Sequence, residues 1–466
     1  MSIDLSESFM AYDVRGLVGE TISSESVRAV GAGFVDALQL AGQQVLVGGD
    51  MRPTSAEFIE AFTEGATARG ANVTQLGMIS TDMLYFACGK LNAPGVVFTA
   101  SHNPAGYNGM KMAKAGAVPI SADTGLEDIR VISQAYLDNG EIPSLGEPTA
   151  VDAESMLTDY ATYLRELVDL SSIRPLKVVV DAANGMAGLT TPIVLGSERL
   201  PGLPLEIIPM YFELDGTFPN HPANPLEPEN LRDLQAAVLE HGADIGLAFD
   251  GDADRCFFID EKGQPVSPSA VTALVARREI ARAKAAGEAE PAIVHNLITS
   301  KAVPELVAAE GGRAVETRVG HSFIKAVMAS EAAVFGGEHS AHYYFRDFWN
   351  ADTGMLAAMH MLAALGQQSL PLSELSREFS PYVASGEINS KVQSKEDAMA
   401  AVEAAFETRD VLVDRMDGLR VQAEDGTWWF NLRPSNTEPY LRFNGEARTA
   451  ETMERTRDEV LALVRR

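Results

Sequence analysis

The chain has 466 residues, of which 46% are hydrophobic and 22% are charged, and its formal net charge is −28. This length predicts a globular protein of about three or four domains. Such an acidic surface excludes nucleic acid and an anionic membrane as partners, because both bind to basic surfaces. An anionic small ligand would therefore need cationic side chains concentrated at its own site.

The sequence also carries no export or membrane signal. No apolar run reaches the roughly 18 residues that a membrane-spanning helix needs, and the acidic N-terminus lacks a signal-peptide pattern. The two cysteines, Cys88 and Cys256, are too few for a disulfide framework or a cysteine metal cage. We therefore expect a cytoplasmic protein.

Helical segments alternate with short apolar strands over most of the chain. The helical patterns of 24–38 and 231–242, placed between runs of β-branched residues, predict α/β layers with largely buried strands. Three stretches repeat this order of elements and so predict three related domains. Each contains an opening strand and a later strand followed by a polar loop, at 44–53 and 95–104, at 177–185 and 245–255, and at 292–301 and 333–342.

The segment after about residue 370 has a different pattern. It predicts a helix at 397–408, strands around 418–435 and 440–447, and a final helix from about 450. Asp425 and Gly426 stand between alternating apolar residues and indicate a hairpin. We expect a smaller α+β domain here, and the predicted domains are 1–152, 153–262, 263–369 and 370–466.

The first chemically distinctive loop is Thr99-Ala100-Ser101-His102-Asn103-Pro104. A serine just after a strand can project its hydroxyl into a cleft, because open α/β sheets bind ligands at the carboxyl ends of their strands. A serine in this position is also a common turn or helix-capping residue. His102 could relay protons or order the loop, and Lys111 could donate to a phosphate.

Asp250, Asp252 and Asp254 follow the apolar strand IGLAF. Three carboxylates at alternate positions repel one another unless a cation lies among them, and Mg²⁺ prefers oxygen ligands of this kind. We expect Gly251 to permit the tight turn. Arg255 next to such a site suits a phosphoryl oxygen, although a solvated acidic turn would show the same spacing.

Two later loops carry further polar groups. Glu338 and Ser340, two apart on a glycine-led loop, can accept from and donate to neighbouring sugar hydroxyls, although an ordinary loop has the same composition. Arg433-Pro434-Ser435-Asn436-Thr437 combines an arginine, two hydroxyls and an amide, and this set predicts a phosphate-binding turn. Upstream, His321 and Lys301 add possible cationic groups.

YDVRG, TASHNP, DGDADR, GEHSAH and RPSNTEP occur in this order over nearly the whole chain. In this set and order the sequence resembles the α-D-phosphohexomutase superfamily, the phosphomannomutase/phosphoglucomutase enzymes. The resemblance implies three α/β/α sandwich domains with mixed sheets and a fourth, smaller α+β domain, all around a central cleft.

The resemblance also implies roles for individual residues. Ser101 would carry the phosphoryl group, and one Mg²⁺ would be bound by the three aspartates together with a phosphoserine oxygen. The general base is left open among Lys111, His102, His321 and Arg15. These four residues and Arg255 would surround the reacting end. The remaining implied site residues are Glu338 and Ser340 at the sugar hydroxyls, Arg433, Ser435, Asn436 and Thr437 at the second phosphate, and Tyr12, Lys301 and His342 as further substrate contacts.

The implied reaction interconverts mannose 6-phosphate and mannose 1-phosphate through a hexose 1,6-bisphosphate, with glucose phosphates as second substrates. His339 and Ala341 depart from the GEMSGH and GEQSGH loops of two subfamilies, whereas His342 favours the mannomutase type over the GEES type. The implied partners are small hexose phosphates, and the chain would be a monomer or weak homodimer. A dedicated phosphoglucomutase, a phosphoglucosamine mutase, a magnesium-dependent sugar phosphatase and an inactive sugar-phosphate sensor are the alternatives.

Overall fold

The computed structural model describes residues 3–145, 149–152, 156–435 and 440–465. Contacts within the chain divide it into two compact units. The first unit contains residues 1–266, 328–335 and 340–375, and the second contains residues 267–327, 336–339 and 376–466.

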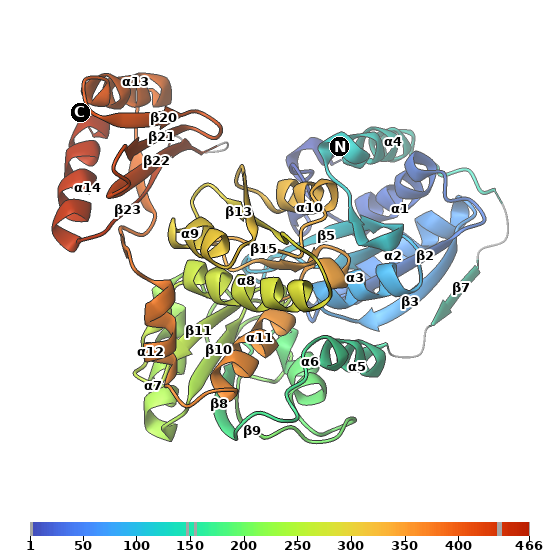
Figure 1. The fold of residues 1–466 in the computed structure, drawn as a ribbon. Coiled ribbons are helices and arrows are strands. Elements are labelled where there is room, and N and C mark those ends of the chain that lie inside the picture. Colours follow the sequence, from blue (N-terminus) through green and yellow to red (C-terminus); the bar gives the residue numbers. More distant parts are fainter. Residues whose placement is uncertain (1–2, 146–148, 153–155, 436–439, 466) are drawn as a thin grey trace. The chain divides into compact units, whose positions relative to one another are not determined.

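The N-terminal sheet of the first unit has the strand order β1-β5-β4-β2-β3-β7, with β6 paired to β5 (Figure 1). The pairs β2–β4, β2–β3 and β3–β7 are parallel, whereas β1–β5 and β4–β5 are antiparallel, so the sheet is mixed. β2 and β4 are buried over almost their whole length, as expected for strands covered on both faces. The strands are β1 (Val14–Leu17), β2 (Gln44–Gly49), β3 (Asn72–Met78), β4 (Gly95–Phe98), β5 (Tyr107–Lys114), β6 (Val118–Pro119) and β7 (Thr149–Asp152).

Two helices of this region pack unusually closely through glycine. A Cβ on Gly31 of α1 would lie 2.3 Å from the carbonyl oxygen of Phe62, and one on Gly65 of α2 would lie 1.9 Å from that of Arg28. Only glycine allows this backbone approach. The helices are α1 (Ser24–Leu38), α2 (Ser55–Ala68), α3 (Thr81–Lys90) and α4 (Leu126–Asn139).

The second sheet, also in the first unit, has the order β12-β11-β10-β8-β9 (Figure 1). β10 pairs in parallel with β8 and antiparallel with β11, and every residue of β10 and β11 is buried. The elements are α5 (Leu157–Leu167), β8 (Leu176–Asp181), α6 (Ala187–Val194), β9 (Leu205–Met210), α7 (Arg232–His241), β10 (Ile245–Phe249), β11 (Cys256–Asp260) and β12 (Pro265–Val266).

The residues of the third sheet are divided between the two units, and its order is β14-β13-β15-β16-β17. β13 and β14 pair in parallel, and β16 and β17 pair antiparallel. The elements are α8 (Pro268–Ala285), β13 (Ala292–Asn296), α9 (Ala302–Ala309), β14 (Arg313–Thr317), α10 (His321–Ser330), β15 (Phe335–Gly337), β16 (Tyr343–Phe345), β17 (Ala351–Asp352), α11 (Gly354–Gly366) and α12 (Leu372–Leu375).

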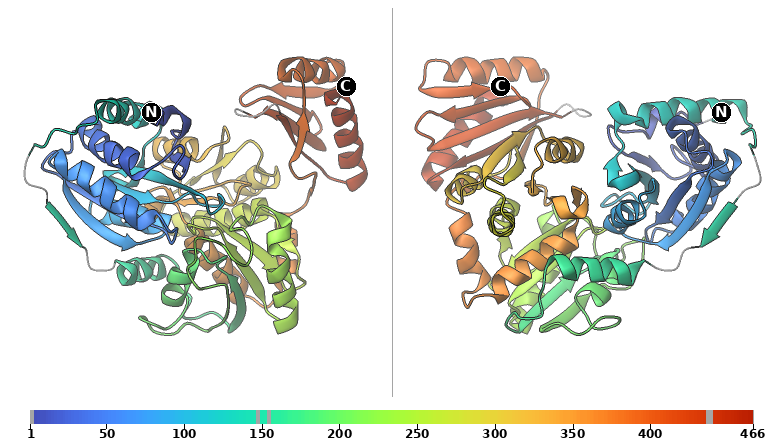
Figure 2. Two further views of the ribbon diagram at one scale, coloured as in Figure 1. Left: turned by 180° about the vertical axis from the view of Figure 1, so that it is seen from behind. Right: turned by 45° about the vertical axis from the view of Figure 1, so that its right-hand side comes forward.

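The fourth sheet lies in the second unit and is antiparallel, with the order β18-β23-β22-β21-β20 and β19 paired to β23. α13 and α14 cover one face of it (Figure 2), and Phe406, Phe430 and Val460 lie in the core between helices and sheet. The elements are β18 (Val383–Ala384), β19 (Ile388–Lys391), α13 (Lys395–Phe406), β20 (Val411–Asp414), β21 (Leu419–Ala423), β22 (Trp428–Pro434), β23 (Tyr440–Ala447) and α14 (Ala450–Val464).

Most predicted elements are found where the sequence places them. The helix predicted at 24–38 is α1, and the one predicted at 231–242 is α7, which ends at Gly242 in the left-handed conformation. The hairpin predicted at Asp425 and Gly426 joins the antiparallel strands β21 and β22. The structure adds the strand β7 at 149–152, which the sequence pattern did not predict.

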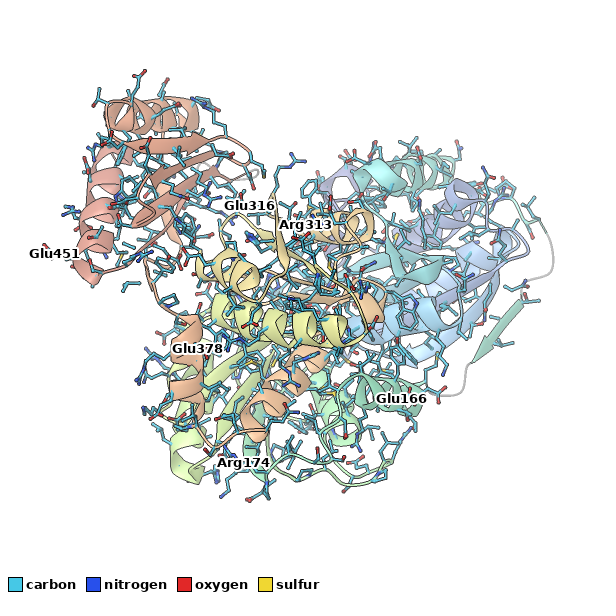
Figure 3. The ribbon with its side chains drawn as sticks, viewed as in Figure 1. Glu166, Arg174, Arg313, Glu316, Glu378 and Glu451 are labelled. Carbon is cyan, nitrogen blue, oxygen red and sulfur yellow. The ribbon has the colours of Figure 1, made fainter. Side chains whose placement is uncertain are left out.

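Acidic side chains occur both on the surface and in the interior, where Asp50, Asp82 and the three aspartates of the turn are buried. Glu166, Glu378 and Glu451, labelled in Figure 3, are all exposed. Both cysteines are buried free thiols, and burial raises the pKa of each. Among the described helices, none has both the length and the apolar composition that crossing a membrane requires.

Candidate active site

Ser101 lies at the carboxyl end of β4, in a backbone conformation that is rare for its residue type. Its φ is +49°, in the left-handed region, which costs a non-glycine residue roughly 1–2 kcal/mol. The amide of Ser101 donates to Thr99 Oγ1 at 2.9 Å. A strained serine after a buried strand is typical of a functional position.

The three aspartates follow β10 in the same unit and are buried. Asp250, Asp252 and Asp254 each direct one carboxylate oxygen to a common point, with these oxygens within 4.8 Å of one another. Ala253, with a φ of +61°, makes the turn between them.

Gly251 lies in this turn, as expected. Its φ is not in the left-handed region; instead, a Cβ on this residue would lie 2.5 Å from the carbonyl oxygen of Ser101. Gly251 is needed because the aspartate turn and the serine loop approach each other closely.

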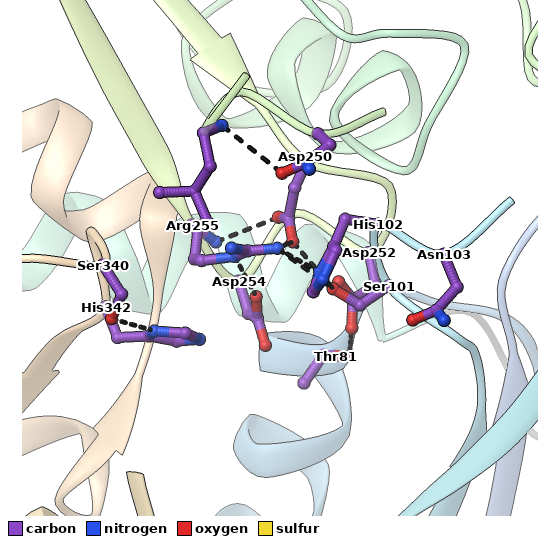
Figure 4. Close-up of polar contacts among 12 residues, drawn as sticks. Thr81, Ser101, His102, Asn103, Asp250, Asp252, Asp254, Arg255, Ser340 and His342 are labelled. Atoms are coloured by element: carbon purple, nitrogen blue, oxygen red, sulfur yellow. Dashed lines mark hydrogen bonds and ion pairs between the residues drawn. The ribbon is translucent and has the colours of Figure 1, made fainter. Parts of the chain in front are cut away.

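The Ser101 hydroxyl takes part in a buried network with residues of the aspartate turn (Figure 4). It donates to Asp250 Oδ2 at 2.9 Å and lies 3.2 Å from His102 Nδ1. Arg255 donates through Nε and Nη2 to the same Asp250 oxygen at 2.9 and 2.7 Å, and Nη2 also lies 3.4 Å from Ser101 Oγ. The predicted nucleophile thus touches both a carboxylate of the acidic cluster and a cation.

His102 is neutral in this network. Burial, together with Arg255 and Arg15, lowers the pKa of His102 to about 2. Arg255 Nη2 donates to His102 Nδ1, so Nδ1 is an acceptor and the proton of the neutral ring is on Nε2. The imidazole therefore orients Arg255 and does not supply a positive charge, and its lowered pKa makes it a weak proton acceptor in this arrangement.

Lys111 and Thr81 hold the other two aspartates. Lys111 Nζ donates to Asp252 Oδ2 at 2.7 Å and also contacts Asp254, and Thr81 Oγ1 donates to Asp252 Oδ2 at 2.6 Å. Burial opposes the charged ammonium, but the two carboxylates outweigh it and hold the pKa of Lys111 well above its usual range. Burial alone would raise the pKa of Asp254. The positive charges of Lys111 and His342 outweigh this effect, so the pKa of Asp254 is lower than usual.

The acidic cluster fits a divalent metal ion. Within the part of the chain that the structure describes, Asp252 Oδ1 and Asp254 Oδ1 are buried and have no hydrogen-bond partner. Burial raises the pKa of Asp250 to about 7 in spite of Arg255, with Asp254 and Asp252 adding to the effect. Carboxylate oxygens that converge without enough donors are the ligands that Mg²⁺ prefers.

Arg15 joins the serine loop from β1. Its Nε donates to Asp13 at 2.8 Å, and its Nη1 donates to the side-chain oxygen of Asn103 at 2.6 Å. Arg15 therefore pairs with Asp13 and also contacts the serine loop. Tyr12, at the preceding position to Asp13, is half-buried.

His342 and Ser340 lie near the acidic cluster in the first unit. Ser340 Oγ is 3.1 Å from His342 Nδ1, and both residues appear beside the aspartates in Figure 4. Ring and carboxylate atoms of His342, Asp254 and Asp352 lie within 4.8 Å of one another. The structure thus brings one end of the predicted sugar loop to the predicted metal site.

Glu338 and Lys301 belong to the second unit. The carboxylate of Glu338, directly after β15, accepts from Asn296 Nδ2 at 2.8 Å, which fixes one of its oxygens. Lys301 precedes α9, and its Nζ lies 3.5 Å from the carbonyl oxygen of Gly426. His339, one of the two residues that depart from the family loops, forms a 2.9 Å hydrogen bond with Ser269.

The predicted phosphate-binding turn is described in part. Arg433 lies in β22, and the amide of the buried Ser435 donates to the carbonyl oxygen of Tyr440 at 2.9 Å. Asn436 and Thr437 lie outside the described residues, as does the side chain of His321.

Three residues that contact the site were not predicted. Thr81 binds Asp252, Asn103 binds Arg15, and Arg52 binds the backbone of the Ser101 loop. Asn103 is part of the TASHNP motif, so the sequence could have indicated that it lies at the site. Thr81 and Arg52 are far from the site in sequence, and only the folded chain brings them to it.

Comparison with known families gives the class of protein. The four models of the phosphoglucomutase/phosphomannomutase family match in chain order: alpha/beta/alpha domain I at 6–137, domain II at 158–263, domain III at 267–382 and the C-terminal domain at 387–463. The chain therefore belongs to the phosphoglucomutase/phosphomannomutase family. The predicted superfamily and the predicted fold class, three α/β/α domains and a smaller C-terminal domain, are confirmed. The boundaries near 152, 262 and 369 and the central cleft stay predictions.

Individual relatives match nearly the whole chain. A phosphomannomutase of Salmonella typhimurium is 40% identical over 446 residues, which is 94% of each chain. Phosphohexose mutases of Xanthomonas campestris are 40% identical over 460 residues, 98% of each chain. The crystal structure of a phosphoglucomutase/phosphomannomutase family protein from Burkholderia thailandensis superposes with a TM-score of 0.86 at 28% identity and covers 99% of this chain and 97% of that one.

Proposed function

We propose that this enzyme is a phosphomannomutase that interconverts mannose 6-phosphate and mannose 1-phosphate through phosphorylated Ser101, with glucose phosphates as second substrates. The observation that carries the proposal is the 2.9 Å hydrogen bond from the Ser101 hydroxyl to Asp250 within a buried acidic cluster. The names of the relatives support the sugar, since the Salmonella relative is a phosphomannomutase.

One Mg²⁺ per chain is the proposed cofactor. Asp250, Asp252 and Asp254 would hold it together with an oxygen of the phosphorylated Ser101. When bound, the ion supplies positive charge that offsets the negative charge of the phosphoryl group during transfer.

The side chains of the site account for the chemistry at the serine. In the forward step the bond between phosphorus and the seryl oxygen breaks, a bond forms to a hexose hydroxyl oxygen, and the proton of that hydroxyl passes to a base. Arg255, with Nη2 3.4 Å from Ser101 Oγ, places positive charge beside the seryl oxygen as it leaves. The product of this step is a hexose 1,6-bisphosphate, whose other phosphate then returns to Ser101. The sequence leaves Lys111, His102, His321 and Arg15 open as the base. In the arrangement described, the raised pKa values of Lys111 and Arg15 and the lowered pKa of His102 argue against those three.

The second phosphate is assigned to Arg433, Ser435, Asn436 and Thr437, and the sugar hydroxyls to Glu338 and Ser340. Tyr12, Lys301 and His342 are further proposed substrate contacts. Because the bisphosphate must bind in two orientations, these groups should recognise the phosphate more tightly than they recognise the orientation of the sugar.

The proposed setting follows from the same assignment. A hexose 1,6-bisphosphate would serve as activator, because it phosphorylates Ser101 directly. We place the enzyme in the cytoplasm as a monomer or weak homodimer.

The test measures kcat/KM for the 1-phosphates of mannose, glucose and glucosamine in the presence of Mg²⁺ and glucose 1,6-bisphosphate. We expect the highest value for mannose 1-phosphate and a measurable one for glucose 1-phosphate. A higher value for glucose or glucosamine 1-phosphate would reassign the substrate within the family.

A labelling experiment tests the phosphoserine. Wild-type enzyme should incorporate ³²P from labelled glucose 1,6-bisphosphate, and Ser101→Ala should incorporate none. Labelling that persists in Ser101→Ala would remove this residue from its role. Release of inorganic phosphate faster than isomerisation would identify a phosphatase, and binding without turnover would identify a sensor.

A further inference from the structure

Arg52 is a buried arginine that binds the backbone of the Ser101 loop. It lies three residues after the end of β2 and two residues after Asp50. Its side chain is fully buried. Its Nη2 donates to the carbonyl oxygens of Ser101 at 2.9 Å and Asn103 at 2.6 Å. Its Nη1 donates to those of Pro104 at 2.9 Å and Tyr107 at 2.8 Å. One guanidinium therefore holds four carbonyl groups of a single loop.

These contacts use all the donors on the two terminal nitrogens of Arg52. A guanidinium has four N–H groups on its two terminal nitrogens, and the four carbonyls match them in number. The remaining N–H, on Nε, faces Asp50 Oδ2 at 3.4 Å. This Nε makes an ion pair with Asp50 but no hydrogen bond among the described residues, and it is fully buried. The terminal nitrogens are occupied by the loop, so Arg52 is not a substrate ligand in this arrangement.

The surroundings of Arg52 keep its position fixed. Asp50 provides the counter-charge and is itself held, because its Oδ1 accepts from the amide of Arg52 at 2.9 Å and from Ser55 Oγ at 2.8 Å. The ring of Phe218 lies under the guanidinium, 5.2 Å from it. Removing a charged group from water costs free energy, so a buried ion pair contributes little to the stability of the fold. A role in placing the loop accounts for its presence.

The loop needs such support because its key residue is strained. Ser101 has a left-handed backbone, and that backbone directs its hydroxyl to Asp250. The carbonyl oxygen of Ser101 accepts a hydrogen bond from Arg52. It also lies so close to Gly251 that a Cβ on Gly251 would be 2.5 Å from it.

We propose that Arg52 is a positioning residue, which holds the Ser101 loop in the conformation that directs the seryl oxygen to the aspartate cluster. It acts on phosphoryl transfer through the main chain of residues 101–107 and does not touch the substrate. The inference rests on the proposed function, since it assigns Arg52 to the phosphorylation of Ser101.

Arg52→Lys tests the proposal, because lysine keeps the charge but has three donors at a single point. We expect the single-turnover rate of ³²P transfer from glucose 1,6-bisphosphate to Ser101 to fall about 100-fold, as for a nucleophile misplaced by about 1 Å. The KM for mannose 1-phosphate should change less than about twofold, because the substrate contacts remain. Mn²⁺ affinity, measured by calorimetry, should stay within about twofold of wild type, which shows that the aspartate cluster is intact.

The matched control is Arg69→Lys. Arg69 lies in the same domain, pairs with Asp36 at 3.0 Å and donates to the carbonyl oxygen of Pro143, but it does not contact the Ser101 loop. This variant should phosphorylate Ser101 at the wild-type rate. In Arg52→Ala, about 20 mM guanidinium should restore labelling at least about tenfold, whereas equal concentrations of methylammonium or urea should not, because only guanidinium reproduces the planar set of donors.

If Arg52→Lys does not fold, Phe218→Leu takes its place, since it removes the ring under the guanidinium and leaves Arg52 in the chain. We expect a decrease in labelling of roughly three- to tenfold with unchanged Mn²⁺ affinity. A wild-type labelling rate in the Arg52 or Phe218 variants would overturn the proposal. A raised KM with unchanged labelling in Arg52→Lys would do so too, and would identify Arg52 as a substrate ligand. Wild-type enzyme that does not label at all would contradict the proposed function instead.

Discussion

The Cα of Gly251 lies so close to the carbonyl oxygen of Ser101 that a Cβ on Gly251 would be 2.5 Å from it. The aspartate turn and the serine loop are therefore in backbone contact, and their separation is fixed by the smallest residue. This contact sets the distance between the seryl oxygen and the carboxylates.

Gly251→Ala should separate these two loops. We expect kcat to fall about 100-fold, because the methyl group pushes the Ser101 loop away from Asp250, with a destabilisation of about 1–3 kcal/mol from overpacking. Steady-state kinetics and thermal unfolding check this. Gly202→Ala is the control, since Gly202 is exposed and its nearest neighbour, Ser197 Cβ, is at an ordinary 3.7 Å. Full activity in Gly251→Ala would show that the loops can move apart without loss.

Lys111→Met should increase the affinity for divalent ions. Lys111 Nζ binds the carboxylates of Asp252 and Asp254, so it competes with a metal ion for the same oxygens. Removing this charge should lower the Kd for Mn²⁺ about tenfold in a calorimetric titration. Turnover should fall at the same time, because a cation near the reacting group is lost. Lys114→Met, on the same strand, should leave the Kd unchanged, and a weaker Kd in Lys111→Met would contradict the competition.

Asp82 should make stability depend on pH. Its carboxylate accepts from Ser80, Tyr160 and Thr353, but burial outweighs these donors and raises the pKa of Asp82 to about 6 from an ordinary value of 3.8. Below pH 4 both the folded and the unfolded state are protonated. Between pH 4 and 6 only the unfolded state releases its proton, so the free energy of unfolding falls as pH rises, by up to about 3 kcal/mol.

Asp82→Asn removes this titration. The stability of Asp82→Asn relative to wild type should increase as pH rises from 4 to 7, whatever their difference at pH 4. Denaturant unfolding of both proteins at several pH values measures this difference in the free energy of unfolding. Asp159→Asn, which changes an exposed carboxylate paired with Lys90, should follow the wild-type slope. Parallel curves for wild type and Asp82→Asn would show that Asp82 does not titrate in this range.

Arg433→Ala should weaken the grip on the phosphate that is not transferred. Loss of a charge-assisted hydrogen bond predicts a KM for mannose 1-phosphate that is about 10- to 100-fold higher. Labelling of Ser101 from glucose 1,6-bisphosphate should persist in part, because Arg433 does not belong to the unit that contains Ser101. Arg409→Ala alters an exposed arginine paired with Glu459 and should leave KM unchanged. An unchanged KM in Arg433→Ala would remove this residue from the substrate site.

The sequence predicted the parts of the fold that depend on local pattern. β4 and β10 are continuous buried runs, and each is followed by a polar loop whose position at the strand end could be read directly. The aspartate cluster was predictable because its spacing is local. The conclusion that three carboxylates need a cation rests on electrostatics alone.

The residues and contacts that were missed act across long sequence separations. Thr81 and Asp252 are 171 positions apart, and Arg52 and Ser101 are 49 apart, so no local pattern pairs them. Gly251 was assigned to a turn because glycine commonly makes turns, but its role depends on a neighbour from another domain. Such contacts follow from the packing of the sheets and not from the motif itself.

The guanidinium of Arg52 grips oxygens that every amino acid possesses, and so it does not discriminate between side chains at the positions it binds. Substitutions at 104–107 that preserve the path of the chain should therefore be tolerated by this contact.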